Sequence, residues 1–515
     1  MIGTGLELAF IAARPWRKNV NGTTSHSSDW ESRPLRKRCR LMGGVAAELA
    51  ARAEQLTELS STAQRRDPVE TITAELMPTC SALRFIGRKG SGVLRTRVYN
   101  ALGRPVWLWG VRSRVYRKPR GKVLVLGTWN YPIFLPGVQA AQALAAGNTV
   151  LLKPAAGCEK VTSCLVDAFH EAGVPASALQ MLPSEAESAI QAIDDGVDLI
   201  VLTGASETGR KVLRQAAETV TPAIMELSGC DAVIVLPGAD ISRVADCIVF
   251  GLLFNAGATC IAPRRIIAET REANLLQKAL SERLKQAGEV TVHTAARAEA
   301  VRLVSGAISS GAIDVLGRFD GSQLLQCGTM SPVLLDRVSQ DDEIAAADLF
   351  APVTGILRVS SIDKAVEIVN RCPYRLAASV FGPGRLAESV AVQLDVGTVC
   401  VNDLIVPTAD PRLTFGGRGE SGFGVTRGED GLLAMSVPVT ISRRHGKFAP
   451  HLQPRQSTDA QTLLGALQLI HAGTLTERFS GLKNMIAAVK TGKNAGASDQ
   501  IQEPQAPSSE KENYS

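Results

Sequence analysis

Apolar runs alternate with helical patterns along the middle of the chain. Between residues 121 and 237, short runs of Val, Leu and Ile recur at the spacing of strands joined by helices. These runs are KVLVLG (122–127), NTVLLKP (148–154), LQML (179–182), LIVLTG (199–204) and AVIVLP (232–237). Strands that are apolar throughout, rather than alternately, indicate a parallel sheet with helices on both faces. The pattern therefore predicts an α/β fold.

A second α/β region extends to about residue 405. Its strand candidates are VTGILRV (353–359) and GTVCVND (397–403). Asp240 is an N-cap residue type and precedes a helix with an apolar face at i, i+3, i+4 spacing. That face comprises Ile241, Val244, Ala245, Ile248, Val249, Leu252 and Leu253. Gly257 is predicted to end the helix. Cys260 then lies on a loop held by a rigid element.

The two ends of the chain lack this alternation. Residues 43–85 are rich in Ala, Leu and Glu and are predicted to be helical. Residues 1–42 are assigned to an N-terminal extension: a disordered segment, a transit peptide, or sequence upstream of a start at Met42. Residues 446–515 are assigned to a C-terminal extension that ends in a disordered polar tail at 493–515.

Composition narrows the class of protein. A chain of 515 residues with 45% hydrophobic and 21% charged residues is typical of a soluble globular protein with more than one domain. The net charge of +6 is scattered and accompanies no nucleic-acid-binding motif, so no nucleic-acid partner is expected. No apolar run reaches about 18 residues, so no membrane span is expected.

The ten cysteines occur singly, without a CxxC pair. This spacing indicates neither a zinc site nor a disulfide framework, and no metal is expected. Unpaired thiols favour a reducing compartment, so the protein is predicted to be cytoplasmic.

Four segments carry side chains suited to catalysis or ligand binding. Asn130, in GTWNYPIF, offers an amide to an oxyanion or simply forms a turn. Lys153, in LLKPA, is interpreted either as a residue that binds ribose or phosphate or as a solvent-exposed charge at the end of a strand. The turn TGASETG (203–209) presents Ser206 and helix N-terminal amides to a pyrophosphate, although it is not a G-x-G-x-x-G sequence. Glu226 precedes a glycine turn and is either a general base with a raised pKa or a salt-bridged strand residue.

Cys260, in NAGATCIAPRR, is by itself most simply interpreted as a small buried hydrophobe. None of the histidines belongs to a recognisable cysteine-hydrolase signature, which argues against a Cys/His protease.

The order and spacing of the segments change that interpretation of Cys260. From about residue 45 to 445 the sequence closely resembles the aldehyde dehydrogenase superfamily. The matching segments are Trp129–Pro132, Lys153–Ala155, Leu202–Gly209, Glu226–Gly229, Asn255–Cys260, Asp348–Pro352 and Phe415–Gly422. Chance agreement of so many ordered motifs is negligible, so a catalytic role becomes the favoured interpretation of Cys260.

The resemblance implies roles for individual residues. Cys260 is implied as the nucleophile, Asn130 as the oxyanion donor and Glu226 as the base that activates water. The implied reaction is oxidation of an aldehyde to the acid, with NAD or NADP as cofactor, through a thiohemiacetal and a thioester. The implied cofactor-binding residues are Trp129, Lys153, Gly204, Ser206, Gly209, Leu227, Asp348 and Phe350.

Two alternatives to this function stay open. The chain is either a catalytically silent relative that acts as a binding or scaffold protein, or an enzyme that passes the acyl group to coenzyme A. Retention of Asn130, Glu226 and Cys260 argues against the first. Family members of the second kind usually lack the glutamate.

Several positions depart from the family's motifs. Asp348 stands where the family has a glutamate that grips the nicotinamide ribose, and Ala351 stands where it has a glycine. Ala258 replaces a glutamine near the cysteine, which leaves the lining of the substrate tunnel undefined. Ala156 stands where NAD-preferring members often carry a glutamate that binds both ribose hydroxyls. A 2′-phosphate would meet no repulsion there, so the enzyme is predicted to accept NADP as well as NAD.

The fold implied by the resemblance has three parts. A Rossmann-type cofactor domain is expected at 43–230 and an α/β catalytic domain at 231–410, with a return to the cofactor domain at 411–445. A small bridging sheet is expected to contain strands near 111–118 and 434–443. Such a sheet leaves an edge open to a second subunit, so a homodimer or homotetramer is expected.

Overall fold

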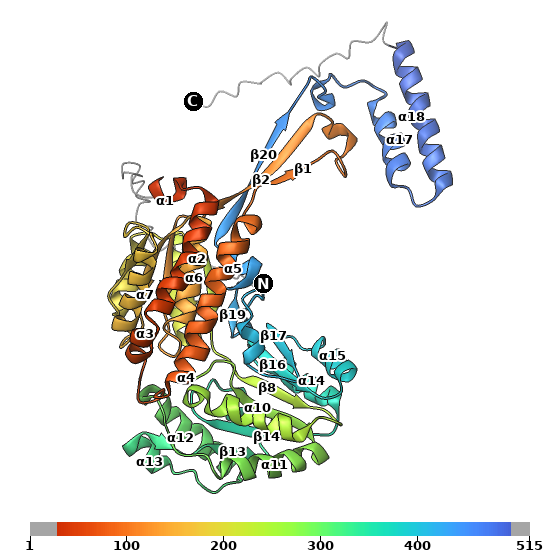
Figure 1. Cartoon of the computed structure of the whole chain (residues 1–515). Coiled ribbons are helices and arrows are strands. Elements are labelled where there is room, and N and C mark those ends of the chain that lie inside the picture. The colour runs from red at the N-terminus through yellow and green to blue at the C-terminus, as the bar shows by residue number, and fades with distance from the viewer. Residues whose placement is uncertain (1–27, 496–515) are drawn as a thin grey trace, which may run out of the picture. The chain divides into compact units, whose positions relative to one another are not determined.

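The computed structural model describes residues 28–495 (Figure 1). Within them the chain divides into two compact units, one of residues 28–97 with 115–441 and one of residues 98–114 with 442–495. The first unit contains the two large sheets of the molecule.

The first sheet has six strands in the order β19-β7-β6-β3-β4-β5. Their bounds are β3 (Lys122–Leu126), β4 (Thr149–Lys153), β5 (Leu179–Met181), β6 (Leu199–Thr203), β7 (Ala223–Glu226) and β19 (Gly422–Phe423). All neighbours are parallel except β19, which pairs antiparallel with β7. The carboxyl ends of the parallel strands therefore meet at one edge of the sheet, where ligands of such sheets usually bind.

Both faces of this sheet are buried, which explains the uninterrupted apolar runs. Val123 and Val125 belong to one hydrophobic cluster, while Leu124 and Leu126 belong to another. The first cluster includes residues of α2 (Leu35–Ala51), α5 (Met77–Val93), α6 (Phe134–Ala146) and α7 (Glu159–Glu171), which cover one face (Figure 1). The second includes residues of α8 (Ala186–Asp194) and α9 (Ser206–Thr219).

The second sheet has seven strands in the order β11-β13-β14-β9-β8-β16-β17. Their bounds are β8 (Asp231–Val235), β9 (Pro263–Glu269), β11 (Ile313–Asp314), β13 (Val333–Asp336), β14 (Val353–Val359), β16 (Ala377–Phe381) and β17 (Thr398–Val401). Only β11 runs antiparallel to its neighbour. One face packs against α10 (Ile241–Leu253) and α11 (Thr270–Leu284). The other packs against α12 (Thr294–Ser309), α14 (Ile362–Arg371) and α15 (Gly384–Ala391).

The predicted α/β fold class is confirmed, and the predicted strands agree with the observed ones within a few residues. The helix predicted after Asp240 is also present, and the Asp240 carboxylate accepts a hydrogen bond from the Arg243 backbone N–H. Its predicted end at Gly257 is wrong. The helix ends at Leu253, because Asn255 and Ala256 both adopt the left-handed region with φ 52°.

Disorder, one of the alternatives for the N-terminal extension at 1–42, is wrong for residues 28–42. Two helices, α1 (Ser28–Ser32) and α2, occupy this stretch. Trp30 is 1% exposed and donates its indole N–H to the Leu144 carbonyl, 3.1 Å away. Cys39 and Met42 are fully buried, so a chain starting at Met42 would lack part of this core. Residues 1–27 lie outside the described part of the chain.

Strands are present near both positions predicted for the bridging sheet, namely β2 (Val111–Pro119) and β20 (Ser436–Arg444). With β1 (Arg97–Tyr99) they form a three-stranded sheet in the order β1-β2-β20. The predicted C-terminal extension contains two helices, α17 (Asp459–His471) and α18 (Leu475–Ala495). The disordered tail predicted at 493–515 is therefore wrong for 493–495, and residues 496–515 lie outside the described part of the chain.

Candidate active site

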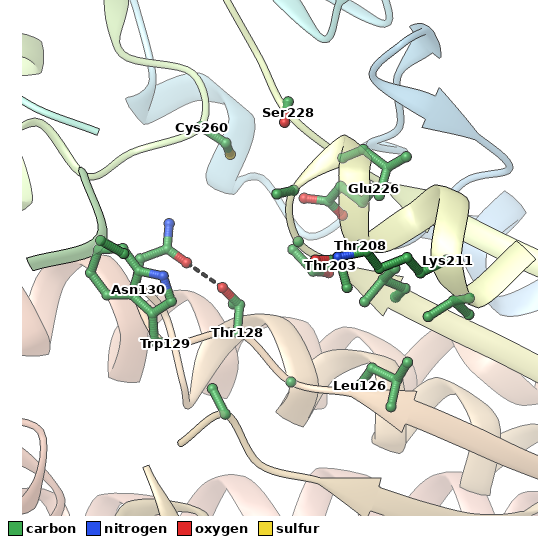
Figure 2. A pocket seen from close by; sticks show the side chains of 18 of the residues that line it. Leu126, Thr128, Trp129, Asn130, Thr203, Thr208, Lys211, Glu226, Ser228 and Cys260 are labelled. Carbon is green, nitrogen blue, oxygen red and sulfur yellow. Dashed lines mark hydrogen bonds between the residues drawn. The ribbon is translucent and has the colours of Figure 1, made fainter. Parts of the chain in front are cut away.

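A cavity of about 740 Å³ opens at the carboxyl ends of β3, β4, β6 and β7 (Figure 2). It is lined from the first sheet and from loops of the second. Most of the site residues predicted from the sequence line it: Cys260, Glu226, Asn130, Trp129, Lys153, Gly204, Leu227, Asp348 and Phe350. The side chains of Cys260, Asn130 and Glu226 come from separate segments and point toward one shared space (Figure 2). The fold thus brings a thiol, an amide and a carboxylate together.

The loop that carries Cys260 is held by backbone contacts. Gly257 has φ 75°, and a Cβ there would lie 2.7 Å from the Ala351 backbone, so only glycine fits. A Cβ on Gly229 would lie 2.1 Å from the Cys260 carbonyl oxygen. The buried Arg264 guanidinium donates to the carbonyls of Ala351 and Gly257. These contacts fix the thiol at the cavity wall.

The Asn130 side chain has a fixed orientation. Its Oδ1 accepts a hydrogen bond from the Thr128 hydroxyl at 2.6 Å, and its Nδ2 donates to the Ala258 carbonyl at 2.9 Å (Figure 2). The amide NH₂ group therefore faces the loop that carries Cys260, as an oxyanion donor requires. One N–H of this group remains after the bond to Ala258.

A buried ion pair that no sequence pattern indicated holds the Asn130 segment in place. The Arg65 guanidinium lies 2.8 Å from Oε1 of Glu75, and both side chains are almost completely buried. The other Glu75 oxygen accepts from the backbone N–H groups of Ile133 and Phe134, at the start of α6. Arg65 also donates to the Asn130 carbonyl at 3.1 Å. The pair connects this turn to the helical layer.

Glu226 is the last residue of β7 and is 3% exposed. Its Oε2 accepts a hydrogen bond from the Thr426 hydroxyl at 3.2 Å, while its buried Oε1 has no hydrogen-bond partner among the described residues. Burial raises the pKa of this carboxyl, and the Arg427 guanidinium and the Thr426 bond partly oppose the rise. A half-satisfied carboxylate with a raised pKa is suited to bind a water and take its proton.

The surroundings of Cys260 do not favour its thiolate. Burial raises the pKa of the thiol, and the negative charges of Glu226, Asp231 and Asp348 raise it further. The nearby positive charge that opposes these effects is Arg427. Its guanidinium is buried, stacks 4.0 Å from the Phe415 ring centroid, and leaves its Nε without a partner among the described residues. Ionisation of the thiol therefore needs a proton acceptor or added positive charge.

A sequence model of the aldehyde dehydrogenase family matches residues 11–441. The chain belongs to the aldehyde dehydrogenase family. It is 29% identical over 457 residues to the 4,4'-diapolycopene aldehyde oxidase of Methylomonas sp., covering 86% of this chain and 84% of that protein. Aldehyde dehydrogenases are oxidoreductases that act on aldehydes with NAD or NADP, and this assignment agrees with the cavity and its side chains.

Solved aldehyde dehydrogenase structures share the fold. The Mycobacterium tuberculosis enzyme complexed with NAD+ is 27% identical, with a TM-score of 0.73 over 80% of this chain and 86% of that one. The NADP-dependent glyceraldehyde-3-phosphate dehydrogenase of Bacillus halodurans C-125, complexed with NADP, is 26% identical, with a TM-score of 0.71 over 81% and 88%. The predicted superfamily, enzyme class and NAD(P) cofactor are thereby confirmed.

Part of the lining of this aldehyde dehydrogenase cavity is aromatic. The Trp129 ring stacks on His293 with centroids 4.2 Å apart and meets Phe350 edge-on at 5.7 Å. Burial, with Arg297 nearby, lowers the pKa of His293, so its ring is neutral near pH 7. Nothing in the sequence pattern indicated His293, which lines the cavity and precedes α12.

The residues present fit a nicotinamide dinucleotide. The buried Oδ1 of Asp348 has no hydrogen-bond partner among the described residues, although it lines the cavity, so it can accept from a ribose hydroxyl. The half-buried Lys153 also lines the cavity, and among the described residues its ammonium donates to the Pro154 carbonyl, at 2.9 Å. Burial lowers the pKa of this ammonium, while the Glu185 and Glu159 carboxylates oppose the effect.

Two predicted cofactor contacts do not line the cavity. The Ser206 hydroxyl donates to the Glu420 carbonyl, and its backbone N–H donates to Ser228 Oγ. A Cβ on Gly209 would lie 2.7 Å from the Leu227 side chain, so this glycine permits the packing of α9 on the strand end. Three residues that the sequence did not single out line the cavity instead: Thr208, Lys211 and Ser228 (Figure 2). Thr208 and Ser228 lie inside the matched segments 202–209 and 226–229 but were not singled out there, and Lys211 follows the first segment on α9.

Proposed function

We propose that this aldehyde dehydrogenase converts an aldehyde to a carboxylic acid through a covalent adduct on Cys260, which Glu226 then hydrolyses. The observation that supports the proposal is the shared cavity of Cys260, Asn130 and Glu226, next to aromatic and carboxylate groups that suit a dinucleotide. Together these groups supply the nucleophile, the oxyanion donor and the base that the reaction uses.

Formation of the adduct uses the thiol and the amide. The Cys260 thiol first loses its proton to solvent water, the sulfur then attacks the carbonyl carbon, the C=O π bond breaks, and the oxygen becomes an oxyanion. The free N–H of Asn130 Nδ2 donates to that oxygen. Removing one such donor typically costs about 10²–10³-fold in rate.

Release of the acid uses Glu226. When bound, the nicotinamide ring accepts a hydride and so supplies the oxidation. The acyl group is then held as a thioester on Cys260. Glu226 takes a proton from water, the hydroxide attacks the thioester carbon, and the carbon–sulfur bond breaks to leave the acid and the Cys260 thiolate.

Two measurements separate this function from the alternatives. Purified protein with aldehyde and NAD or NADP is expected to increase absorbance at the wavelength of the reduced nicotinamide, and the product is expected to be the free acid. A silent scaffold protein would give no reduced cofactor. A coenzyme A-acylating enzyme would need coenzyme A for turnover and would give an acyl thioester in solution.

The substrate is proposed to be an aldehyde with an apolar chain. Asn130 is followed directly by a buried apolar cluster that includes Tyr131, Phe134 and Val138 and whose Leu135 lines the cavity. The Cys260 side chain packs against a second cluster with Ile261, Leu376 and Phe415. The Methylomonas relative is named for an aldehyde of a long hydrocarbon, which also supports this class.

A panel of aldehydes tests the substrate class. We expect kcat/KM to rise with alkyl chain length and to be lower for an aldehyde of similar length that ends in a carboxylate. Burying the unpaired carboxylate in such clusters would be unfavourable. Preference for the acidic aldehyde would contradict the proposal.

The enzyme is proposed to use NADP as well as NAD, with residue 156 controlling the balance. Ala156 is exposed three residues after Lys153 and offers no hydrogen bond to the ribose hydroxyls. Hydrogen bonds to a carboxylate contribute roughly 1.5–3 kcal/mol, and the same carboxylate would repel a 2′-phosphate. Ala156→Glu is therefore expected to lower kcat/KM for NADP and raise it for NAD, each by about tenfold.

The matched control for this prediction is Ala156→Gln. It has the size and hydrogen-bonding capacity of glutamate without the charge, so it is expected to leave kcat/KM for NADP within a few fold of the parent enzyme. If the parent enzyme already rejects NADP by about a thousandfold, the hypothesis is wrong. Glu159 or Glu185, whose charges act on Lys153, would then supply the repulsion.

The assembly and location of the enzyme are proposed from simpler features. In the order β1-β2-β20, the outer strands β1 and β20 have no further partner among the described residues, which supports a homodimer or homotetramer. All ten cysteines are free, which supports a cytoplasmic location. Among the described residues, no helix is long and apolar enough to cross a membrane. Light scattering of the purified protein gives the subunit number.

A further inference from the structure

The helices α17 and α18 form a hairpin that lies beyond the part of the chain matched by the family model, which ends at residue 441. The cavity and all its lining residues precede it. The hairpin supplies no residue of the cavity, so its role lies outside the proposed chemistry.

The contact between the two helices is made by small residues. A Cβ on Gly481 would lie 2.7 Å from the Gly465 carbonyl oxygen, and a Cβ on Gly465 would lie 2.6 Å from the Met485 backbone nitrogen. Ala488, two turns further along α18, is 3% exposed. The backbones thus approach closely, as in helix pairs that pack in an apolar environment.

Large apolar side chains point away from this contact. On α18 they recur at i, i+4, i+7, i+11 and i+14, which places them in one stripe along the helix. We call this the α18 stripe: Leu475, Phe479, Leu482, Ile486 and Val489. Phe479 is 64% exposed and Ile486 is 45% exposed. On α17, Leu463, Leu464 and Leu467 are also more than half exposed. A hairpin in water normally has the reverse arrangement, with its large apolar residues inside.

The charged residues that flank the α18 stripe are all basic. Arg478, Lys483 and Lys490 are exposed and lie within about a quarter turn of it at the helical spacing. The acidic residue of α18, Glu477, accepts from the Thr474 backbone N–H at the start of the helix. The surface that meets the stripe is therefore expected to be apolar and to carry negative charge at its boundary.

We propose that the hairpin docks this enzyme on a lipid bilayer surface that contains anionic lipids, with the α18 stripe in the acyl boundary and the flanking basic residues at the headgroups. The hairpin would lie in the interface rather than cross the bilayer, since no described helix is suited to span a membrane. A second copy of this chain fits less well, because its own basic residues would lie against those that flank the stripe.

Vesicle flotation with the full-length enzyme tests the proposal. We expect the enzyme to float with vesicles of phosphatidylcholine containing phosphatidylserine, to float much less with phosphatidylcholine alone, and to be released by high salt. The double variant Lys483→Glu, Lys490→Glu is expected to lower the bound fraction on the anionic vesicles by about tenfold or more.

A matched pair of single variants isolates the stripe. Phe479→Asp places a charge in the stripe and is expected to abolish flotation. Ser480→Asp adds the same charge one residue further along, outside the stripe, and is expected to retain flotation. Both positions are exposed, so the fold of the helix tolerates either change.

Oxidation of a small water-soluble aldehyde is expected to be the same in all these variants, because the hairpin contributes nothing to the cavity. This readout separates a failure of docking from a failure of the proposed catalytic function. Absence of flotation, or equal flotation of Phe479→Asp and the parent enzyme, would overturn the proposal. So would a subunit number in solution that falls when Phe479 is changed, because the stripe would then be an interface between copies of the chain.

Discussion

Replacing Cys260 by serine is expected to abolish aldehyde oxidation while leaving cofactor affinity within a few fold of the parent enzyme. The two side chains are almost isosteric, so the loop held by Arg264 and Gly257 is not disturbed. A hydroxyl, however, ionises far less readily than a thiol, and the thiol itself already needs help in this buried site. We expect kcat to fall by about 10⁴-fold or more, the scale on which other enzymes lose activity without their nucleophile.

The measurement is reduced-nicotinamide formation, together with calorimetric binding of NAD and NADP. Cys80→Ser is the matched control, because Cys80 is a partly buried thiol on α5 that does not line the cavity. Its sulfur contacts the Ala46 carbonyl, and a serine hydroxyl can keep that contact. The control is expected to retain full activity. Normal turnover by Cys260→Ser would show that the sulfur is not the nucleophile.

The central strands of the first sheet were predictable because they are buried on two faces, whereas β9, β13 and β16 of the second sheet were not predicted. A strand such as β3, whose alternate residues enter different clusters, must be apolar at every position, and that signal is local in the sequence. The site residues at the ends of these strands were predictable for a related reason. Glu226 and Lys153 end parallel strands of one sheet, so the topology brings them to the same edge.

The groups that position these site residues were not predictable. Arg65 and Glu75 lie more than fifty residues before the Asn130 turn that they hold. In the sequence, each resembles an ordinary charged residue of the helical segment predicted at 43–85. Arg427 faces Glu226 and Cys260 only because the chain returns to the first sheet after the second is complete. A buried charge is recognised by its partners, and partners distant in sequence have no fixed spacing.

The errors at the two ends of the chain have a common cause. The buried face of α2 contains Cys39 and Met42 but also Arg38, whose guanidinium is buried because it donates to the Ala145 carbonyl. Its basic residues resemble those of an exposed extension. In α17 and α18 the apolar residues face outward and glycines face inward, which is not the pattern of a soluble helix pair. In neither segment does the buried face consist of large apolar residues alone. The face of α2 includes a charged guanidinium, and the contact between α17 and α18 is made by glycines.

Replacing Glu226 by glutamine is expected to stop steady turnover while sparing the first turnover. The amide has nearly the same shape and can keep the contact with Thr426, but it cannot take a proton from water. A burst of reduced cofactor roughly equal to the enzyme concentration is therefore expected, followed by a rate lower by about 10²–10⁴-fold, the usual contribution of a general base. The thioester on Cys260 should accumulate and be detectable by mass spectrometry of the intact protein.

The pH dependence provides the second readout for Glu226. Because burial raises the pKa of the carboxyl, its ionised, proton-accepting form is lost as the pH falls through that raised pKa. Turnover of the parent enzyme is therefore expected to decline at a pH above the ordinary glutamate value of about 4.3, and this acid limb is expected to be absent in Glu226→Gln. If the burst disappears as well, Glu226 acts earlier and accepts the proton of the Cys260 thiol, whose own pKa is raised by burial. If turnover is unchanged, the carboxylate is a structural group and the water must be activated by another residue of the cavity.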